Sequence, residues 1–86
     1  SKIILERAAK ECKTAKYGIA NIDLTIIAEE PKLSAHLEKI RTNLSQILLI
    51  EANQIGLKAT TNESIGCVGR KEAIAVFSVC LLQRED

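Results

Sequence analysis

The sequence predicts an α/β (α+β) domain built on a mixed β-sheet. Apolar residues recur at helical spacing in residues 1–16 and 34–48, and they alternate with polar residues in 19–28 and 55–60. A third extended segment, residues 72–82, follows a turn-rich loop. The expected order is therefore helix, strand, helix, strand, strand, within one small domain of 86 residues.

The first helix is expected over residues 1–16, where small or apolar residues lie between charged ones and Tyr17-Gly18 ends the pattern. In residues 19–28, aliphatic residues alternate with polar ones, which indicates a strand covered mainly on one face. Pro31 ends this strand, because a proline disfavours the helical conformation at the preceding residue, Glu30.

Ser34 is expected to be the N-cap of the second helix. The apolar stripe of that helix consists of Leu37, Ile40, Leu44, Ile47 and Leu48. Residues 55–60 alternate again and predict a second strand, so the strand–helix–strand unit should be a right-handed parallel crossover.

The last segment, residues 72–82, is apolar on both faces. Such a strand is either central in its sheet or covered by another subunit. We expect it to be antiparallel to the preceding strand, to which a short connection joins it. Because 47% of this small chain is hydrophobic, homo-oligomerisation is also expected.

Composition argues against several classes of function. The net charge of +1 gives no reason to expect nucleic acid or an anionic membrane as a partner, and the apolar stretch 73–82 is too short to span a bilayer. Cys12, Cys67 and Cys80 lack the spacing of a disulfide framework or a zinc ribbon, so free thiols in a reducing compartment are expected, with Cys67 and Cys80 as buried fillers. The absence of methionine suggests a fragment or processed piece of a longer protein.

The loop after the second strand combines residue types that suit a phosphate and a divalent ion. Thr60 and Thr61 offer adjacent hydroxyls, Glu63 offers a carboxylate, and Arg70 follows a glycine-containing turn. Hydroxyls and exposed backbone N–H groups can bind phosphate oxygens, and a carboxylate can hold an ion that bridges them. The alternative is that Thr60-x-x-Glu63 is a helix capping box, although Gly66 and Gly69 leave almost no helix to cap.

Residues 21–28 with Pro31-Lys32, and residues 58–61 through 69–72, resemble the C-terminal half of the 2-C-methyl-D-erythritol 2,4-cyclodiphosphate synthase family. The resemblance covers essentially all 86 residues, so residues 1–86 would be the C-terminal part of one such domain, without its N-terminal strand and zinc-ligand region. It implies a chorismate-mutase-like homotrimer, with helices packed on one face of each sheet and active sites between subunits.

The same resemblance implies a lyase of non-mevalonate isoprenoid biosynthesis. This enzyme cyclises 4-diphosphocytidyl-2-C-methyl-D-erythritol 2-phosphate to 2-C-methyl-D-erythritol 2,4-cyclodiphosphate and releases CMP. The implied location is the bacterial cytoplasm or a plastid-type organelle, and the implied partner is the cytidine-diphosphate-linked substrate, with no nucleic acid or membrane. The alternative is a non-catalytic trimeric module for nucleotide binding or assembly that lacks the zinc half.

The resemblance also assigns site residues. Thr61 and Glu63 would be catalytic, and Glu63 would hold a Mg or Mn ion that bridges the diphosphate. The nucleotide would be bound by Ala28, Pro31, Lys32, Leu33, Ser34, Ala59, Thr60, Thr61 and Arg70. The trimer channel would be lined by Cys67, Arg70 and Glu72. The zinc of the complete enzyme would have no ligand here, because the only histidine, His36, matches no ligand position and is expected on the surface.

For some of these residues a structural interpretation remains open. Residues 28–33 could form an ordinary strand-to-helix loop stiffened by Pro31, and Arg70 with Glu72 could form a weak surface ion pair. Lys58 could be solvated or lie near the phosphates, whereas Asp23 is expected to be structural.

Four residues of this chain depart from the family pattern, of which Asn62, in place of a third threonine, is a mild change. Cys67 stands where a phenylalanine is common, and Lys71 and Ala73 replace glycines, so backbone strain is expected wherever φ must be positive. Glu29 and Glu30 place two negative charges in this segment, and a neighbouring diphosphate would disfavour them.

Overall fold

The computed structural model describes residues 2–29 and 33–85. Its elements follow the order expected from the sequence, with two 3₁₀ turns (η) and one short helix in addition. They are α1 (Lys2–Thr14), β1 (Tyr17–Ile27), η1 (Ser34–His36), α2 (Leu37–Leu48), η2 (Ala52–Gln54), β2 (Ile55–Thr60), α3 (Gly66–Gly69) and β3 (Ala75–Arg84).

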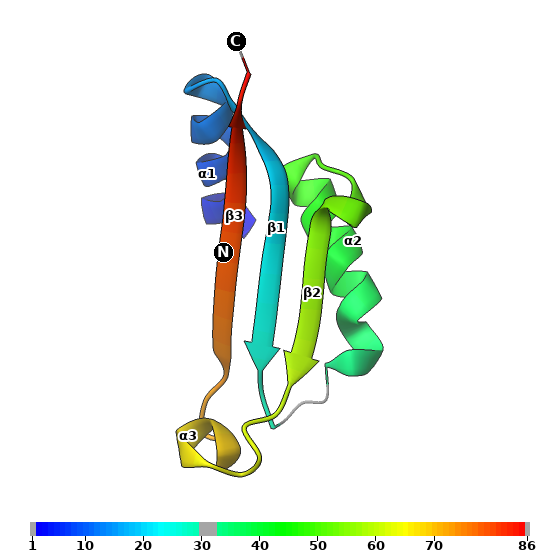
Figure 1. Ribbon diagram of the computed structural model, residues 1–86, viewed down its shortest axis with the longest axis vertical. Helices are drawn as coiled ribbons and strands as arrows, with labels where there is room; N and C mark the ends of the chain where they lie inside the picture. The colour runs from blue at the N-terminus through cyan, green and yellow to red at the C-terminus, as the bar shows by residue number, and fades with distance from the viewer. Residues whose placement is uncertain (1, 30–32, 86) are drawn as a thin grey trace.

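The strands form one mixed sheet in the order β2-β1-β3 (Figure 1). β1 pairs with β2 in parallel, which confirms the parallel strand–helix–strand unit, and it pairs with β3 in antiparallel orientation. β3 therefore runs opposite to β2 as predicted, but β1 lies between them. Among the three described strands, β3 lies at the edge of the sheet.

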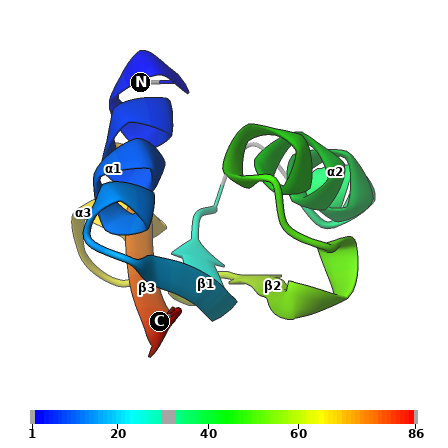
Figure 2. The same cartoon turned by 90° about the horizontal axis from the view of Figure 1, so that it is seen from above.

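Both long helices, α1 and α2, lie on the same face of the sheet (Figure 2). The buried apolar residues are few: Ile22 and Ala28 at β1, Ile55 on β2 and Leu48 at the end of α2. Ile22 and Ile55 are register partners in the parallel pair, so the core lies between this pair and α2. The other face of the sheet has no helix over it among the described residues.

A β-bulge near the start of β1 is fixed by the turn that precedes β2. The β1–β3 register shifts between Ile19 and Asn21. The Gln54 side chain donates to the carbonyl oxygens of Ile19 at 3.1 Å and Ala20 at 3.0 Å. Gln54 also completes a capping box with Glu51, so one turn satisfies the bulge and starts β2.

One expectation and one alternative about helix starts are corrected. Ser34 is not the N-cap of α2, because it lies in η1 and His36 precedes α2 without a side-chain capping bond. The capping box Thr60-x-x-Glu63 does not form either. The short helix α3 starts at Gly66, after Ile65, so its first turn lies beyond both residues.

The expected burial of two cysteines is also wrong for the single chain. Cys67 lies on α3, outside the sheet, and Cys80 lies on the edge strand β3, so both are exposed. Partial burial, and then the neighbouring Cys12, raise the pKa of the Cys80 thiol, which lowers its reactivity as a nucleophile. In the part of the chain that the structure describes, no helix has the length and apolar character needed to cross a membrane.

Candidate functional site

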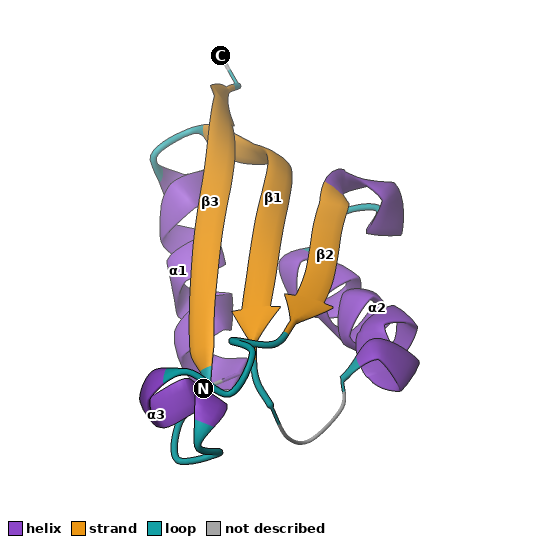
Figure 3. Ribbon diagram, turned by 60° about the horizontal axis from the view of Figure 1, so that its bottom comes forward, coloured by secondary structure: helices purple, strands orange, loops and turns teal. Residues whose placement is uncertain are grey.

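β1 and β2 end side by side, and this brings the two predicted nucleotide segments together. Ile27 is the register partner of Thr60, and the Ala28 N–H donates to the Thr60 carbonyl oxygen at 3.0 Å. The segment after β1 and the loop after β2 therefore lie at the same end of the sheet, together with α3 (Figures 1 and 3). The carboxyl ends of parallel strands are the usual position of ligand sites in such sheets.

The hydroxyls and the carboxylate predicted from the sequence are all exposed at this end. The Thr61 Oγ1 accepts the Glu63 N–H at 3.3 Å, and its own hydrogen is left to donate to a ligand. The Thr60 Oγ1 makes only a long contact of 3.5 Å with the Thr61 carbonyl oxygen. Thr61 is thus the better oriented of the two hydroxyls for donation to an anion.

Glu63 and the next residue share an unusual backbone conformation. Glu63 has φ 51° and Ser64 has φ 63°, both in the left-handed region. Residues other than glycine pay about 1–2 kcal/mol each for this conformation, so the turn needs compensating contacts. Such strain is often found where a side chain is aimed at a ligand.

The backbone N–H groups of this turn are already bound within the protein. Those of Asn62 and Ser64 donate to the Glu29 Oε1 at 2.9 and 3.1 Å, and that of Ile65 donates to the Asn62 carbonyl oxygen at 3.0 Å. The expected phosphate contacts from exposed N–H groups are therefore not offered at these positions. Among the described residues of this turn, the groups that remain for a ligand are the Thr60 and Thr61 hydroxyls and the Glu63 carboxylate.

Gly69 lets α3 pack directly on the turn. A Cβ atom at Gly69 would lie 2.1 Å from the carbonyl carbon of Ser64 and 2.6 Å from its Cα. Real Cβ atoms do not approach backbone atoms this closely, so no side chain fits at this buried position. Neither Gly69 nor Glu29 was assigned a positional role from the sequence, because both act through contacts that only the strand pairing creates.

Arg70 and Glu72 form the ion pair that the structural interpretation predicts. The Arg70 Nε lies 2.9 Å from the Glu72 Oε1, and the two side chains are 61% and 58% exposed. At this exposure such a pair contributes little to stability. Their position in a trimer channel, like that of Cys67, remains a prediction.

Lys71 carries the backbone strain that its replacement of a family glycine predicts. It has φ 66°, whereas Ala73 does not have a positive φ, so only one of the two positions required the glycine. We expect Lys71→Gly to raise the free energy of unfolding by about 1 kcal/mol relative to Lys71→Ala, because both variants lose the lysine side chain and only glycine relieves the strain. Urea unfolding of the two variants measures this difference, and equal midpoints would contradict the strain argument.

The remaining predicted residues differ in how far they are buried. Ala28 is buried, Leu33 and Ala59 are half-buried, and Ser34 is exposed at the start of η1. Pro31 and Lys32 lie outside the described residues. The other residues singled out from the sequence (Asp23, His36 and Lys58) are exposed.

The site has one carboxylate that suits a divalent ion bound mainly by phosphates. Among residues 2–29 and 33–85, no three His, Cys, Asp or Glu side chains come together as a metal cluster. Mg²⁺ commonly keeps several waters and uses one or two carboxylates together with substrate phosphates, so Glu63 alone fits that role. Zinc, which prefers several His or Cys ligands, has no such set in the described part.

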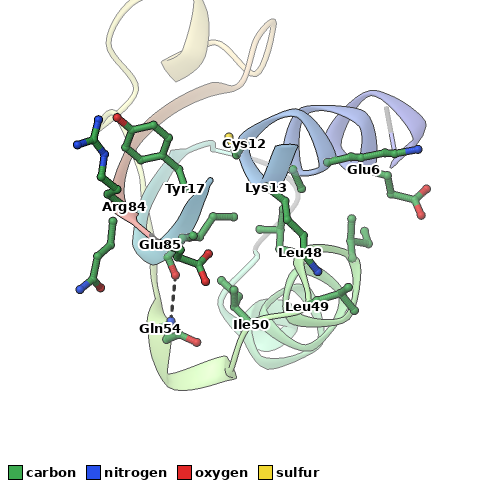
Figure 4. A pocket seen from close by; sticks show the side chains of 16 residues that line it. Glu6, Cys12, Lys13, Tyr17, Leu48, Leu49, Ile50, Gln54, Arg84 and Glu85 are labelled. Carbon is green, nitrogen blue, oxygen red and sulfur yellow. Dashed lines mark hydrogen bonds between the residues drawn. The ribbon is translucent and has the colours of Figure 1, made fainter. Parts of the chain in front are cut away.

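A cavity lies elsewhere in the molecule. A hollow of about 890 Å³ is lined by α1, the end of α2 and the far ends of β1 and β3, including Cys12, Tyr17 and Gln54 (Figure 4). It lies at the opposite end of the sheet from Thr61 and Glu63, and none of the predicted nucleotide or metal residues that the structure describes lines it. Volume alone does not make it the better candidate, because convergent polar chemistry lies at the other end.

Comparisons with known proteins point to one family. Residues 1–83 match the YgbB family. The 2-C-methyl-D-erythritol 2,4-cyclodiphosphate synthases of Francisella philomiragia and Francisella tularensis are 49% identical over 84 residues, which are 98% of this chain and 53% of those proteins. The chain thus spans about half the length of the curated relatives it matches.

Solved structures agree with this match. The Plasmodium vivax 2C-methyl-D-erythritol 2,4-cyclodiphosphate synthase has a TM-score of 0.95 and 40% identity, covering 99% of this chain and 57% of that one. A CDP complex of Plasmodium falciparum IspF has a TM-score of 0.95 and 35% identity, covering 99% of this chain and 55% of that one.

Proposed function

This chain belongs to the YgbB family, and from that premise we propose that it forms the nucleotide-binding part of a 2-C-methyl-D-erythritol 2,4-cyclodiphosphate synthase. The complete enzyme would cyclise 4-diphosphocytidyl-2-C-methyl-D-erythritol 2-phosphate and release CMP. The observation that carries the proposal is the convergence of Ala28, Thr61 and Glu63 at one end of the β1–β2 pair. The CDP complex of the Plasmodium falciparum relative supports a cytidine diphosphate as the ligand.

The proposed reaction needs positioning more than acid–base chemistry. An oxygen of the substrate's 2-phosphate forms a bond to the β-phosphorus, and the bond from that phosphorus to the oxygen of CMP breaks. The Thr61 hydroxyl would donate to the diphosphate and Thr60 would lie beside it, while the segment Ala28 to Ser34, with Pro31 and Lys32, would anchor the cytosine. The complete protein would operate in the bacterial cytoplasm or a plastid-type organelle.

Metal ions belong to this proposal in two different ways. Glu63 would hold the Mg²⁺ or Mn²⁺ ion, which neutralises charge on the diphosphate when it is bound. A zinc ion of the complete enzyme would need ligands from outside residues 2–29 and 33–85, since that part holds no cluster for it.

A homotrimer is proposed as the assembled form. Phe77, Val79 and Leu81 of β3 are 65%, 71% and 60% exposed. They alternate along the strand and pair with Thr25, Asp23 and Asn21, so all three lie on the sheet face that α1 and α2 leave open. A row of this size is typical of a surface that another protomer covers. Native mass spectrometry of the full chain that carries these residues tests the trimer directly.

Glu63→Gln should separate metal binding from nucleotide binding. In the full chain, we expect CDP to bind more tightly with Mg²⁺ than without it. In the variant, the ratio of these two affinities should be at least about tenfold smaller. Isothermal titration with and without Mg²⁺ measures both quantities. Glu11→Gln, an exposed carboxylate on α1, is the matched control and should bind like the wild type. Equal affinity for CDP and ADP would remove the cytidine assignment.

The alternative function is a non-catalytic module for nucleotide binding or assembly. A turnover assay distinguishes the two functions, because only the enzyme converts its diphosphate substrate and releases CMP. Nucleotide binding without turnover in the full chain would favour the module.

A further inference from the structure

The strained turn that carries Glu63 is held by a residue of the segment after β1. Glu29 lies two positions beyond the end of β1, and its Oε1 accepts the N–H groups of Asn62 at 2.9 Å and Ser64 at 3.1 Å. These two donors flank Glu63 in the chain. The other hydrogen bonds described for residues 61–65 join them to one another, to Thr60 or to Gly69, so Glu29 provides their side-chain tie to the segment after β1.

We infer that Glu29 is a positioning residue that sets the place of the Glu63 carboxylate; the inference rests on the proposed function. Positive φ angles at Glu63 and Ser64 are unfavourable, so the turn persists only if contacts determine it. An acceptor oxygen shared by the two N–H groups provides such contacts, and at 2.9 and 3.1 Å the Glu29 carboxylate makes both of them. Without them the turn can relax, and the Glu63 side chain then leaves the backbone in another direction.

The charge of Glu29 distinguishes this role from direct ligand binding. A carboxylate beside a diphosphate site opposes anion binding, so Glu29 is poorly suited to contact the phosphates themselves. Its use as an acceptor explains why an acidic residue fits here. A glutamine amide oxygen also has two lone pairs and carries no charge, so Glu29→Gln should keep the anchor.

The test compares Glu29→Ala with Glu29→Gln in the full chain. For the alanine variant we expect about a tenfold loss of the Mg²⁺-dependent gain in CDP affinity, with CMP binding in the absence of metal unchanged. The glutamine variant should restore the gain. In the absence of ligand, the amide hydrogens of Asn62 and Ser64 should exchange faster only in the alanine variant.

Glu51→Ala is the matched control. Glu51 also accepts a backbone N–H, in the capping box before β2, but at the opposite end of that strand. It should leave both CDP affinity and the exchange of the Asn62 and Ser64 amides unchanged. If Glu29→Ala lowers metal-free CMP binding by the same factor, or if Glu29→Gln is as weak as Glu29→Ala, the positioning role is refuted.

Coupling between Glu29 and Glu63 provides the second measurement. If Glu29 acts through Glu63, Glu29→Ala should cause no further loss of metal-dependent affinity in the Glu63→Gln background. Additive losses would refute the inference while leaving the proposed function intact. A wild-type chain that binds no cytidine nucleotide would instead refute the proposed function, and the inference with it.

Discussion

Replacing Ile55 by alanine should lower the free energy of unfolding by about 2–4 kcal/mol. Ile55 is 3% exposed and opens β2, where it pairs in register with Ile22 and faces the same core as Leu48. Its carbonyl oxygen also accepts the Arg41 Nε at 3.1 Å, which ties α2 to the strand. Because so few side chains are buried, the cavity left by truncation has little other core to compensate for it.

Urea unfolding followed by circular dichroism measures this loss. Ile3→Ala is the matched control, because Ile3 is 78% exposed on α1 and alanine is the better helix former. The control should change the free energy of unfolding by less than about 0.5 kcal/mol. Equal midpoints for the two variants would mean that the β1–β2–α2 core does not determine the stability of the chain.

The strands and helices were predictable because their hydrophobic patterns are periodic. Residues 55–60 alternate over their whole length, and β2 has these bounds. β1, in contrast, begins at Tyr17 rather than Ile19, because tertiary pairing with Arg84 extends it into a segment whose glycine suggested a break. Periodicity reports which face is buried, whereas strand ends depend on what lies alongside.

The pairing of β3 was not predictable from adjacency in the sequence. A short connection favours a hairpin between consecutive strands, but residues 61–74 are long enough to pass the end of β1. β3 then pairs with β1 along almost its whole length, from Tyr17–Arg84 to Ile27–Ala75. That choice depends on the matched lengths of the two strands, which no local pattern encodes.

The residues of the candidate site were likewise only partly predictable from the sequence. Thr61 and Glu63 were found from residue type and spacing, because few other uses of a loop require those groups together. The Glu29 anchor was not found, since it follows from the register Ile27–Thr60 and from positive φ angles that glutamate and serine do not predict. Replacement of family glycines marked Lys71 and Ala73 alike as positions of possible strain, and only Lys71 has a positive φ.

Gly69→Ala should disrupt the turn that carries Glu63 more than any surface change in the loop. The new Cβ would overlap the backbone of Ser64, and backbone atoms cannot rotate away as a side chain can. We expect the free energy of unfolding to fall by about 1–3 kcal/mol. The amides of Asn62 and Ser64 should also exchange faster, because the displaced Ser64 can no longer donate to Glu29.

Gly66→Ala separates this overlap from backbone strain. Gly66 also lies on α3 and has φ 71°, but a Cβ there would meet its nearest atom, the Asn62 Nδ2, only at 3.9 Å. Its cost should therefore be about 1 kcal/mol, with the Asn62 and Ser64 amides still protected. Thermal unfolding and amide exchange of both variants give the comparison. If the two variants lose the same stability and protection, α3 can move away from Ser64, and the contact at Gly69 does not hold Glu63 in place.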